Sequence, residues 1–128
     1  MAGFFGIGTD LVEVGRIERS LGRPRFAEEV FGDRERAYCA AKARPAEHFA
    51  ARFAAKEAFL KSLGRGIFSG IALRDIQVVN EADGRPLLAL GPTAAGALKD
   101  AGLSGAELHV TLSHTASMAA ATVVVRAP

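Results

Sequence analysis

Hydrophobic and polar positions divide the chain into a helical first half and a strand-rich second half. After a glycine-punctuated apolar stretch, apolar residues recur at helical spacing up to residue 63; from residue 73 they alternate with polar residues or form β-branched runs. We expect, in chain order, a strand over 4–14, helices over 15–21, 26–30, 34–42 and 45–63, strands over 73–80 and 87–90, a helix over 93–101, and strands over 108–112 and 119–125.

Glycine and proline mark the ends of these segments. Gly22 and Pro24 stop the first helix, and Pro45 suits the first turn of the long helix. Gly64 is a candidate for the C-terminal cap of that helix. An Asp-Gly pair at 83–84 predicts a tight turn between two strands.

The order of these elements predicts an α+β fold. We expect one small domain over residues 1–128, with a mainly antiparallel sheet packed on the long, buried helix. Its length suffices for a core, and 49% hydrophobic and 23% charged residues are typical of globular proteins. Cys39 is the only cysteine, which excludes an intrachain disulfide and a cysteine-based zinc cluster.

The apolar stretches are short. None approaches the ~18 residues of a membrane-spanning helix, so we expect no membrane segment. The N-terminal apolar stretch has no basic residue before it and ends at Asp10, unlike a secretory leader. We therefore expect a cytoplasmic location.

The long helix combines a largely apolar surface with four charges. Phenylalanines and leucines form one bulky arc of its helical wheel and alanines cover much of the rest, so we expect the helix to be buried. The charged residues are Arg52, Lys56, Glu57 and Lys61. Two interpretations remain open from the helix alone: a Glu57–Lys61 ion pair with the lysine stems along the surface, or a cleft that holds a cation and phosphate.

Asp10 and a glycine-rich loop favour the cleft. Asp10 follows two glycines near the end of the first strand, and with Glu57 it would form a sparse all-oxygen site that suits Mg²⁺. Gly64, Gly66 and Gly70 follow the long helix, where backbone N–H groups can approach an anion. The chain contains no Walker sequence, no GxGxxG, no histidine zinc spacing and no Ser/His/Asp arrangement.

The net charge of +2, from 16 basic and 14 acidic residues, conceals an uneven distribution. Residues 1–65 carry 12 bases and 9 acids, whereas residues 66–128 carry 4 and 5. The densest basic cluster consists of Arg16, Arg19, Arg23 and Arg25. Such a cluster is either a solvated face or a surface for an anionic partner. A single tyrosine, no tryptophan and no interleaving of aromatic with basic residues disfavour nucleic acid as that partner.

Three blocks of the sequence resemble the motifs of holo-acyl-carrier-protein synthases, the single-domain bacterial type of the 4′-phosphopantetheinyl transferase family. They read GIGTDLVEV at 6–14, RFAAKEAFLK at 52–61 and LSHT at 112–115, in the order and spacing of that family. The resemblance implies the family's fold and the transfer of 4′-phosphopantetheine from coenzyme A to a serine of apo acyl carrier protein. The by-product is 3′,5′-ADP, and the reaction depends on Mg²⁺.

The resemblance also implies roles for individual residues. Asp10 and Glu57 would hold the metal, and Glu57 would steer the serine proton, directly or through water. Lys61 would stabilise the leaving phosphate, so that Asp10, Glu57 and Lys61 form the catalytic group. Contacts to coenzyme A are expected from Arg52, Lys56, Lys61, Gly64, Gly66, Pro86, Ser113, His114 and Thr115.

The basic cluster resembles the docking surface for acidic acyl carrier protein, with Arg16, Arg19, Arg23, Arg25 and the apolar Phe26. Larger relatives carry two similar halves with coenzyme A between them, so a chain of this length implies a homotrimer with a site at each subunit interface. Whether the carrier serves fatty acid biosynthesis or polyketide synthesis stays open. Two alternatives also remain: another Mg²⁺-dependent phosphoryl-transfer enzyme, or a non-catalytic anion-binding module.

Overall fold

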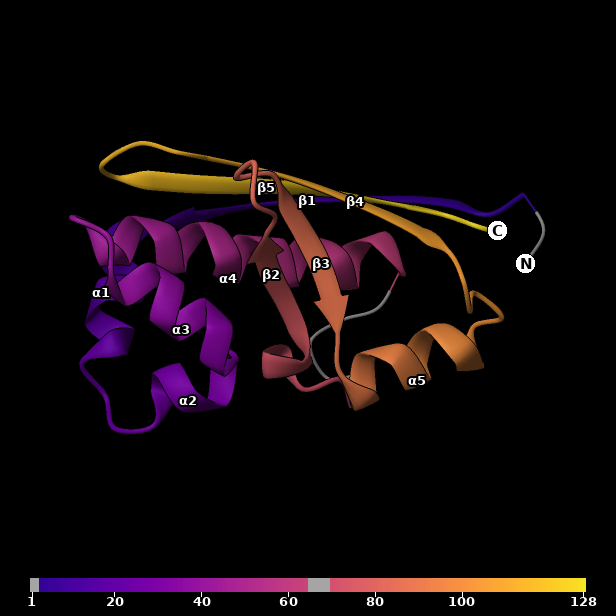
Figure 1. Cartoon of the computed structure of the whole chain (residues 1–128), viewed down its shortest axis with the longest axis horizontal. Helices are drawn as coiled ribbons and strands as arrows, with labels where there is room; N and C mark the ends of the chain where they lie inside the picture. The colour runs from indigo at the N-terminus through magenta and orange to yellow at the C-terminus, as the bar shows by residue number, and fades with distance from the viewer. Residues whose placement is uncertain (1–2, 65–69) are drawn as a thin grey trace.

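A three-stranded antiparallel sheet and one long helix form the two main layers of the protein (Figure 1). The computed structural model describes residues 3–64 and 70–128. The strand order is β1–β5–β4, and the strands are β1 (Phe5–Glu13), β5 (Met118–Arg126) and β4 (Glu107–His114). Helix α4 (Pro45–Ser62) runs along one face of this sheet.

Near the start of α4 lie α1 (Val14–Leu21), α2 (Phe26–Val30) and α3 (Asp33–Ala40). The 3-10 turn η1 (Leu73–Asp75), the strands β2 (Ile76–Asn80) and β3 (Pro86–Leu90), and α5 (Pro92–Asp100) follow α4 in the chain. Strands β2 and β3 pair with each other as a separate antiparallel hairpin. Helices α1, α2, α3 and α5 lie on the side of α4 away from the sheet, and the β2–β3 hairpin crosses α4 and reaches the sheet beside β4 (Figure 1). The expected α+β fold with antiparallel sheets is confirmed.

The core lies between α4 and the sheet. Phe59 and Leu60 of α4 are fully or almost fully buried, and the alanines along this helix let the strands approach it closely. The sheet contributes alternate residues of β5, including Val123 and Val125, which are completely buried. The expected burial of the long helix is confirmed.

One expected strand is shorter than the pattern predicts. The sequence favours a strand over 73–80, but its first residues form η1. Asp75 explains the difference, because its carboxylate accepts hydrogen bonds from the backbone N–H and hydroxyl of Thr93 at 2.8 and 2.6 Å. Asp75 therefore turns to hold the start of α5 before the strand begins.

The second face of the main sheet carries no helix among residues 3–64 and 70–128. Phe5, Ile7 and Leu11 of β1 point outward there and are 60%, 62% and 65% exposed. These residues form an apolar outer face along β1. In the part of the chain that the structure describes, no helix has the length and hydropathy needed to cross a membrane.

Candidate active site

Two glycines let α4 lie directly against β1. Gly6, Gly8 and Asp10 share the face of β1 that meets the helix, because alternate residues of a strand point to the same side. A Cβ at Gly8 would overlap the carbonyl oxygen of Ala58, and a Cβ at Gly6 would overlap that of Ser62. The close approach brings Asp10, the next residue in phase, against the C-terminal half of α4.

Asp10, Glu57 and Lys61 form the candidate catalytic group at this contact. Lys61 donates from Nζ to Asp10 Oδ1 at 3.0 Å and to the carbonyl oxygen of Thr9 at 3.1 Å. Burial and the nearby Asp10 carboxylate raise the pKa of Glu57, whereas the charges of Lys61 and Arg16 oppose this rise. The two carboxylates are therefore close enough to repel each other.

This donor set fits a magnesium ion. Asp10 and Glu57 supply hard oxygen donors, and a divalent cation would relieve their mutual repulsion. Among the described residues, no group of three or more His, Cys, Asp or Glu side chains is assembled to hold a metal. Two carboxylates alone suit Mg²⁺, which keeps several waters and takes phosphate oxygens as further ligands.

Lys56 has a different role from the one the sequence predicts. Its side chain is completely buried, and Nζ donates to Glu35 Oε1 at 2.6 Å, to Ile76 O at 2.6 Å and to Leu73 O at 3.1 Å. An ammonium has three N–H groups, so no donor is left for a phosphate. The expectation that Lys56 contacts coenzyme A is wrong, and the residue instead ties α4 to α3 and β2.

A hollow of about 210 Å³ lies apart from the catalytic group and is called the second hollow below. It is lined by three of the residues expected to contact coenzyme A: Arg52, Pro86 and His114. Arg52 donates to Asn80 Oδ1 at 2.7 Å. His114 Nδ1 lies 3.0 Å from Glu47 Oε1. A basic wall on α4 and the end of β4 therefore faces the β2–β3 hairpin.

Other residues expected to contact coenzyme A lie outside this hollow. Ser113 points to the opposite face of β4 from His114. The hydroxyl of Thr115 accepts hydrogen bonds from two backbone N–H groups of the β4–β5 turn. Gly64 follows the C-terminal cap of α4, at the end of the helix that carries Lys61. Its positive φ of 71° is the backbone conformation that its expected capping role requires. Gly66 lies outside the described residues.

The catalytic group and the second hollow are at opposite edges of the main sheet. Asp10 is on β1 and His114 on β4, with β5 between these strands. On α4, Arg52 is about 140° around the helix axis from Glu57 and about 180° from Lys61. One copy of the chain therefore does not bring the two groups into a single cleft.

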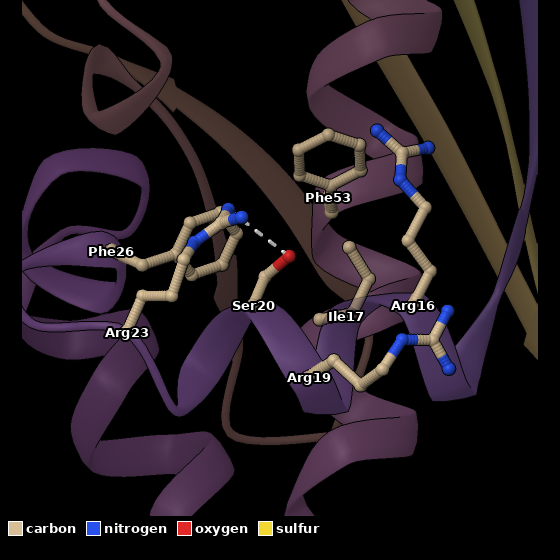
Figure 2. Close-up of a pocket in the computed structure, with 7 residues that line it drawn as sticks. All are labelled: Arg16, Ile17, Arg19, Ser20, Arg23, Phe26 and Phe53. Carbon is tan, nitrogen blue, oxygen red and sulfur yellow. Dashed lines mark hydrogen bonds between the residues drawn. The ribbon is translucent and has the colours of Figure 1, made fainter.

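A basic pocket of about 310 Å³ lies beside α1 (Figure 2). It is lined by Arg16, Ile17, Arg19, Ser20, Arg23, Phe26 and Phe53. The guanidinium of Arg16 lies over the Phe53 ring and that of Arg23 over the Phe26 ring, each 5.5 Å from the ring centroid. Helix α1 ends before Arg23, yet Arg23 still joins the pocket. Arg25 does not line it and has a left-handed backbone conformation, with φ of 68°.

Comparison with known proteins identifies the family of the chain. Residues 6–119 match the family model described as the 4′-phosphopantetheinyl transferase superfamily, ACPS. The chain belongs to the 4′-phosphopantetheinyl transferase superfamily.

Members of the superfamily resemble the chain over nearly its whole length. A holo-[acyl-carrier-protein] synthase from Syntrophus aciditrophicus is 49% identical over 93% of each chain. Among solved structures, an ACPS–CoA complex from Chronobacterium ammoniagenes has a TM-score of 0.84 at 29% identity and covers 98% of each chain. A holo-(acyl-carrier-protein) synthase from Bacillus anthracis in complex with CoA (3′,5′-ADP) has a TM-score of 0.78 at 33% identity and covers 96% of each.

These similarities confirm the family, the fold and the enzyme class expected from the sequence. Because the family model and the curated relatives are transferases, the alternative of a non-catalytic anion-binding module is set aside.

Several residues around these sites have no role in the sequence-based interpretation: Glu35, Tyr38, His48 and Asn80. Two signals point to Glu35: a buried lysine requires a carboxylate partner, and an acid three residues after Gly32 has the spacing of a helix cap. No signal in the sequence marks Asn80.

Proposed function

We propose that this phosphopantetheinyl transferase moves 4′-phosphopantetheine from coenzyme A to a serine hydroxyl of apo acyl carrier protein, releasing 3′,5′-ADP with Mg²⁺ as cofactor. The observation that carries the proposal is the Lys61–Asp10 ion pair beside the basic pocket, with the Glu57 carboxylate near enough for both charges to affect its pKa. Relatives named holo-[acyl-carrier-protein] synthase and structural neighbours in complex with CoA support the same reaction. Both proposed substrates are soluble, and we place the reaction in the cytoplasm.

Glu57 takes the proton of the attacking serine in this proposal. As the serine oxygen bonds to the β-phosphorus of coenzyme A, its proton passes to the Glu57 carboxylate, directly or through water. The bond from that phosphorus to the bridging oxygen breaks, and 3′,5′-ADP leaves with the electron pair. Mg²⁺ held by Asp10 and Glu57 would supply positive charge to the diphosphate.

Lys61 stabilises the negative charge that develops on the departing phosphate. Its side chain is 55% exposed, and Asp10 and Thr9 hold the ammonium at the open edge of α4. A cation fixed there before the reaction contributes to catalysis because no solvent has to reorganise around the new charge.

The basic pocket serves as the docking site for the acidic carrier protein. Arg16, Arg19 and Arg23 supply its charge, and Phe26 and Phe53 supply apolar surface. Arg16 is near enough to Glu57 to affect the pKa of that carboxylate. A carrier bound in the pocket would therefore present its serine close to the catalytic group.

The proposed assembly is a homotrimer in which the β1 edge of one copy meets the β4 edge of the next. A contact between unlike edges closes as a ring when the rotation from copy to copy completes a circle, and the number three is implied by the family resemblance. The arrangement would unite Asp10, Glu57 and Lys61 of one copy with the hollow around Arg52 and His114 of its neighbour. It would also cover the apolar outer face of β1.

An intact-mass assay tests the proposed reaction. The protein is mixed with coenzyme A, Mg²⁺ and a panel of fatty-acid and polyketide apo acyl carrier proteins. We expect the mass of a carrier to rise by one phosphopantetheine group, and removal of Mg²⁺ with EDTA to abolish the rise. If no carrier in the panel gained mass, the proposed function would be wrong.

Variants of the two carboxylates test the metal assignment. Asp10→Ala and Glu57→Ala should each abolish the mass gain while the protein stays folded. Asp100→Ala is a matched control, because it removes an exposed carboxylate from the end of α5. Full activity of either site variant would refute the role given to that carboxylate.

A further inference from the structure

His48 lines the second hollow, and the proposed reaction gives it no role. Its ring makes two edge-to-face contacts, with centroid distances of 5.0 Å to His114 and 6.1 Å to Tyr38. These contacts come from three different elements, α4, β4 and α3. The imidazole is therefore held in place at the wall of the hollow.

The same wall carries a permanent positive charge. Arg52 is 2% exposed, lies over the Tyr38 ring at 4.3 Å and donates to Asn80. Its Nε is buried and has no hydrogen-bond partner among the described residues. Because a guanidinium keeps its proton in proteins, this charge persists at every physiological pH. An anion is the ligand that such a wall favours.

His114 lines the same hollow and is tied to Glu47. Its Nδ1 lies 3.0 Å from Glu47 Oε1. An ionised carboxylate only accepts hydrogen bonds, so Nδ1 is the donor in this contact. In a neutral ring Nε2 then carries a lone pair and no proton, so His114 borders the hollow without donating a hydrogen bond to an anion.

The groups around His48 favour its neutral form when no anion is bound. Burial has the largest effect on the pKa of His48, and it lowers that pKa. His114, Arg52 and Lys42 lower it further, and only Glu47 opposes them. His48 also lies in the N-terminal part of α4, where the helix dipole disfavours a positive side chain.

We propose that His48 takes up a proton from solvent when a dianionic phosphate monoester enters this hollow, so that the His48 imidazolium and the Arg52 guanidinium hold the monoester together. The inference rests on the proposed function, because coenzyme A carries such a monoester at the 3′ position of its ribose. Two negative charges in the hollow favour the imidazolium by the same electrostatic effect that disfavours it in the empty hollow. The proton moves from water to His48, and no covalent bond of the substrate changes.

Proton uptake would make recognition of coenzyme A depend on pH. Linkage requires that a ligand whose binding takes up one proton binds up to about tenfold more weakly for each unit of rising pH. Dephospho-coenzyme A lacks the monoester and should bind without this dependence. His48 thereby becomes a specificity-determining residue for the phosphorylated substrate.

Isothermal titration of the full-length protein with Mg²⁺ present tests the inference. Coenzyme A is titrated between about pH 6.5 and 8, above the second pKa of a phosphate monoester near 6. Each titration is repeated in two buffers with different enthalpies of ionisation, which gives the number of protons taken up. We expect net uptake with coenzyme A, and a Kd that rises several-fold per pH unit.

The variant His48→Phe keeps an aromatic ring beside Tyr38 and His114 but cannot be protonated. We expect it to lose the proton uptake and most of the pH dependence, and to weaken coenzyme A binding more at the acid end of the range. Dephospho-coenzyme A should give no uptake with either protein.

Three results would overturn the inference and leave the proposed function standing. They are coenzyme A binding by the unmodified protein without proton uptake, unchanged uptake in His48→Phe, and equal uptake with dephospho-coenzyme A. Failure of the unmodified protein to bind coenzyme A at all would overturn both.

Discussion

Lys56 and Glu35 form an ion pair of 2.6 Å in which both side chains are completely buried. The carboxylate of Glu35 also accepts backbone hydrogen bonds from Gly32 at 3.1 Å and Val78 at 2.9 Å. The pair therefore joins three elements, α3, α4 and β2, at the residue that precedes Glu57. Such a fully hydrogen-bonded pair fixes the position of α4 about its own axis, and so the direction in which Glu57 points.

Removal of one partner of this pair should destabilise the protein strongly. Lys56→Met leaves the Glu35 carboxylate buried without its counter-charge, and breaking a buried pair in this way costs about 3–5 kcal/mol. Denaturant unfolding at one fixed protein concentration measures the change. Lys99→Met, at an exposed position of α5, is the matched control and should change the free energy of unfolding by less than about 0.5 kcal/mol.

A double variant separates the buried charge from other effects of the substitution. Glu35→Gln combined with Lys56→Met leaves no unpaired charge, and the glutamine keeps the shape of the glutamate. We expect the double variant to recover at least half of the stability that Lys56→Met loses. If it were less stable than the single variant, charge pairing would not explain the loss.

Gly8 is the position where a single methyl group should disturb the catalytic group. A Cβ there meets the backbone of α4, which cannot move away as a flexible side chain would. Gly8→Ala should push α4 from β1, separate Lys61 from Asp10 and lower activity by at least tenfold; overpacking of this kind typically costs about 1–3 kcal/mol of stability. The mass-gain assay and denaturant unfolding measure the two effects.

Gly96→Ala is the control for that substitution. Gly96 lies within α5, and a Cβ at this position has no neighbour within 4 Å. We expect activity to stay the same and stability to rise by about 0.5–1 kcal/mol, because alanine favours a helix more than glycine does. Equal activity of the two variants would show that the close approach at Gly8 does not position the site.

The sequence pattern predicted much of this fold because most elements depend on local signals. Helix α4 begins at Pro45 and its cap is followed by Gly64, as expected from the conformational preferences of proline and glycine. Asp75 shows where local signals fail. Its carboxylate caps α5 through Thr93, eighteen positions away, and a contact of that range leaves no periodic trace in the sequence.

The site was predictable where motif and geometry coincide and not where burial decides the chemistry. Asp10 and Lys61 are far apart in sequence, and the family motifs placed both in the catalytic group. The structure supplies the physical reason for their contact, which is the close approach of α4 to β1 at Gly6 and Gly8. The expectation that Lys56 contacts an anion came from the family resemblance, and a helical wheel does not show which element covers each face of α4. Only the positions of Glu35 and β2 reveal that its ammonium is fully used.

Cys39 should resist thiol reagents in the folded protein. It is completely buried, and burial raises the pKa of its thiol to about 11. We expect slow reaction with Ellman's reagent from about pH 7 to 9 and rapid reaction in concentrated guanidinium chloride, since an unfolded cysteine has a pKa of about 8.5. Fast labelling of the native protein that followed a pKa near 8.5 would contradict this.

The same thiol makes a pH-dependent contribution to stability. Its pKa is higher in the folded than in the unfolded state, so its contribution is complete below about pH 8.5 and is lost as the pH rises towards 11. The free energy of unfolding should therefore fall across this range by more in the unmodified protein than in Cys39→Ala.

Arg16→Glu should weaken docking of the carrier protein. The substitution places a negative charge in the basic pocket, so we expect the KM for the carrier to rise at least tenfold and its dependence on salt to become shallower. Lys99→Glu reverses one positive charge on α5 and is the control. Unchanged kinetics towards the carrier in Arg16→Glu would rule out the docking assignment.

The division of the site between two sheet edges predicts that two inactive variants can restore each other. Glu57→Ala damages the catalytic group near β1, and His114→Ala damages the hollow at the end of β4. If each site combines one edge from each of two copies, random mixing leaves about a quarter of the interfaces with both edges intact. The two variants, mixed under conditions that exchange subunits, should then regain about that fraction of activity in the mass-gain assay. Addition of Leu11→Glu to both should prevent the recovery, because it places a charge on the apolar outer face of β1. Activity no greater than the sum of the separate variants would mean that one copy carries a complete site.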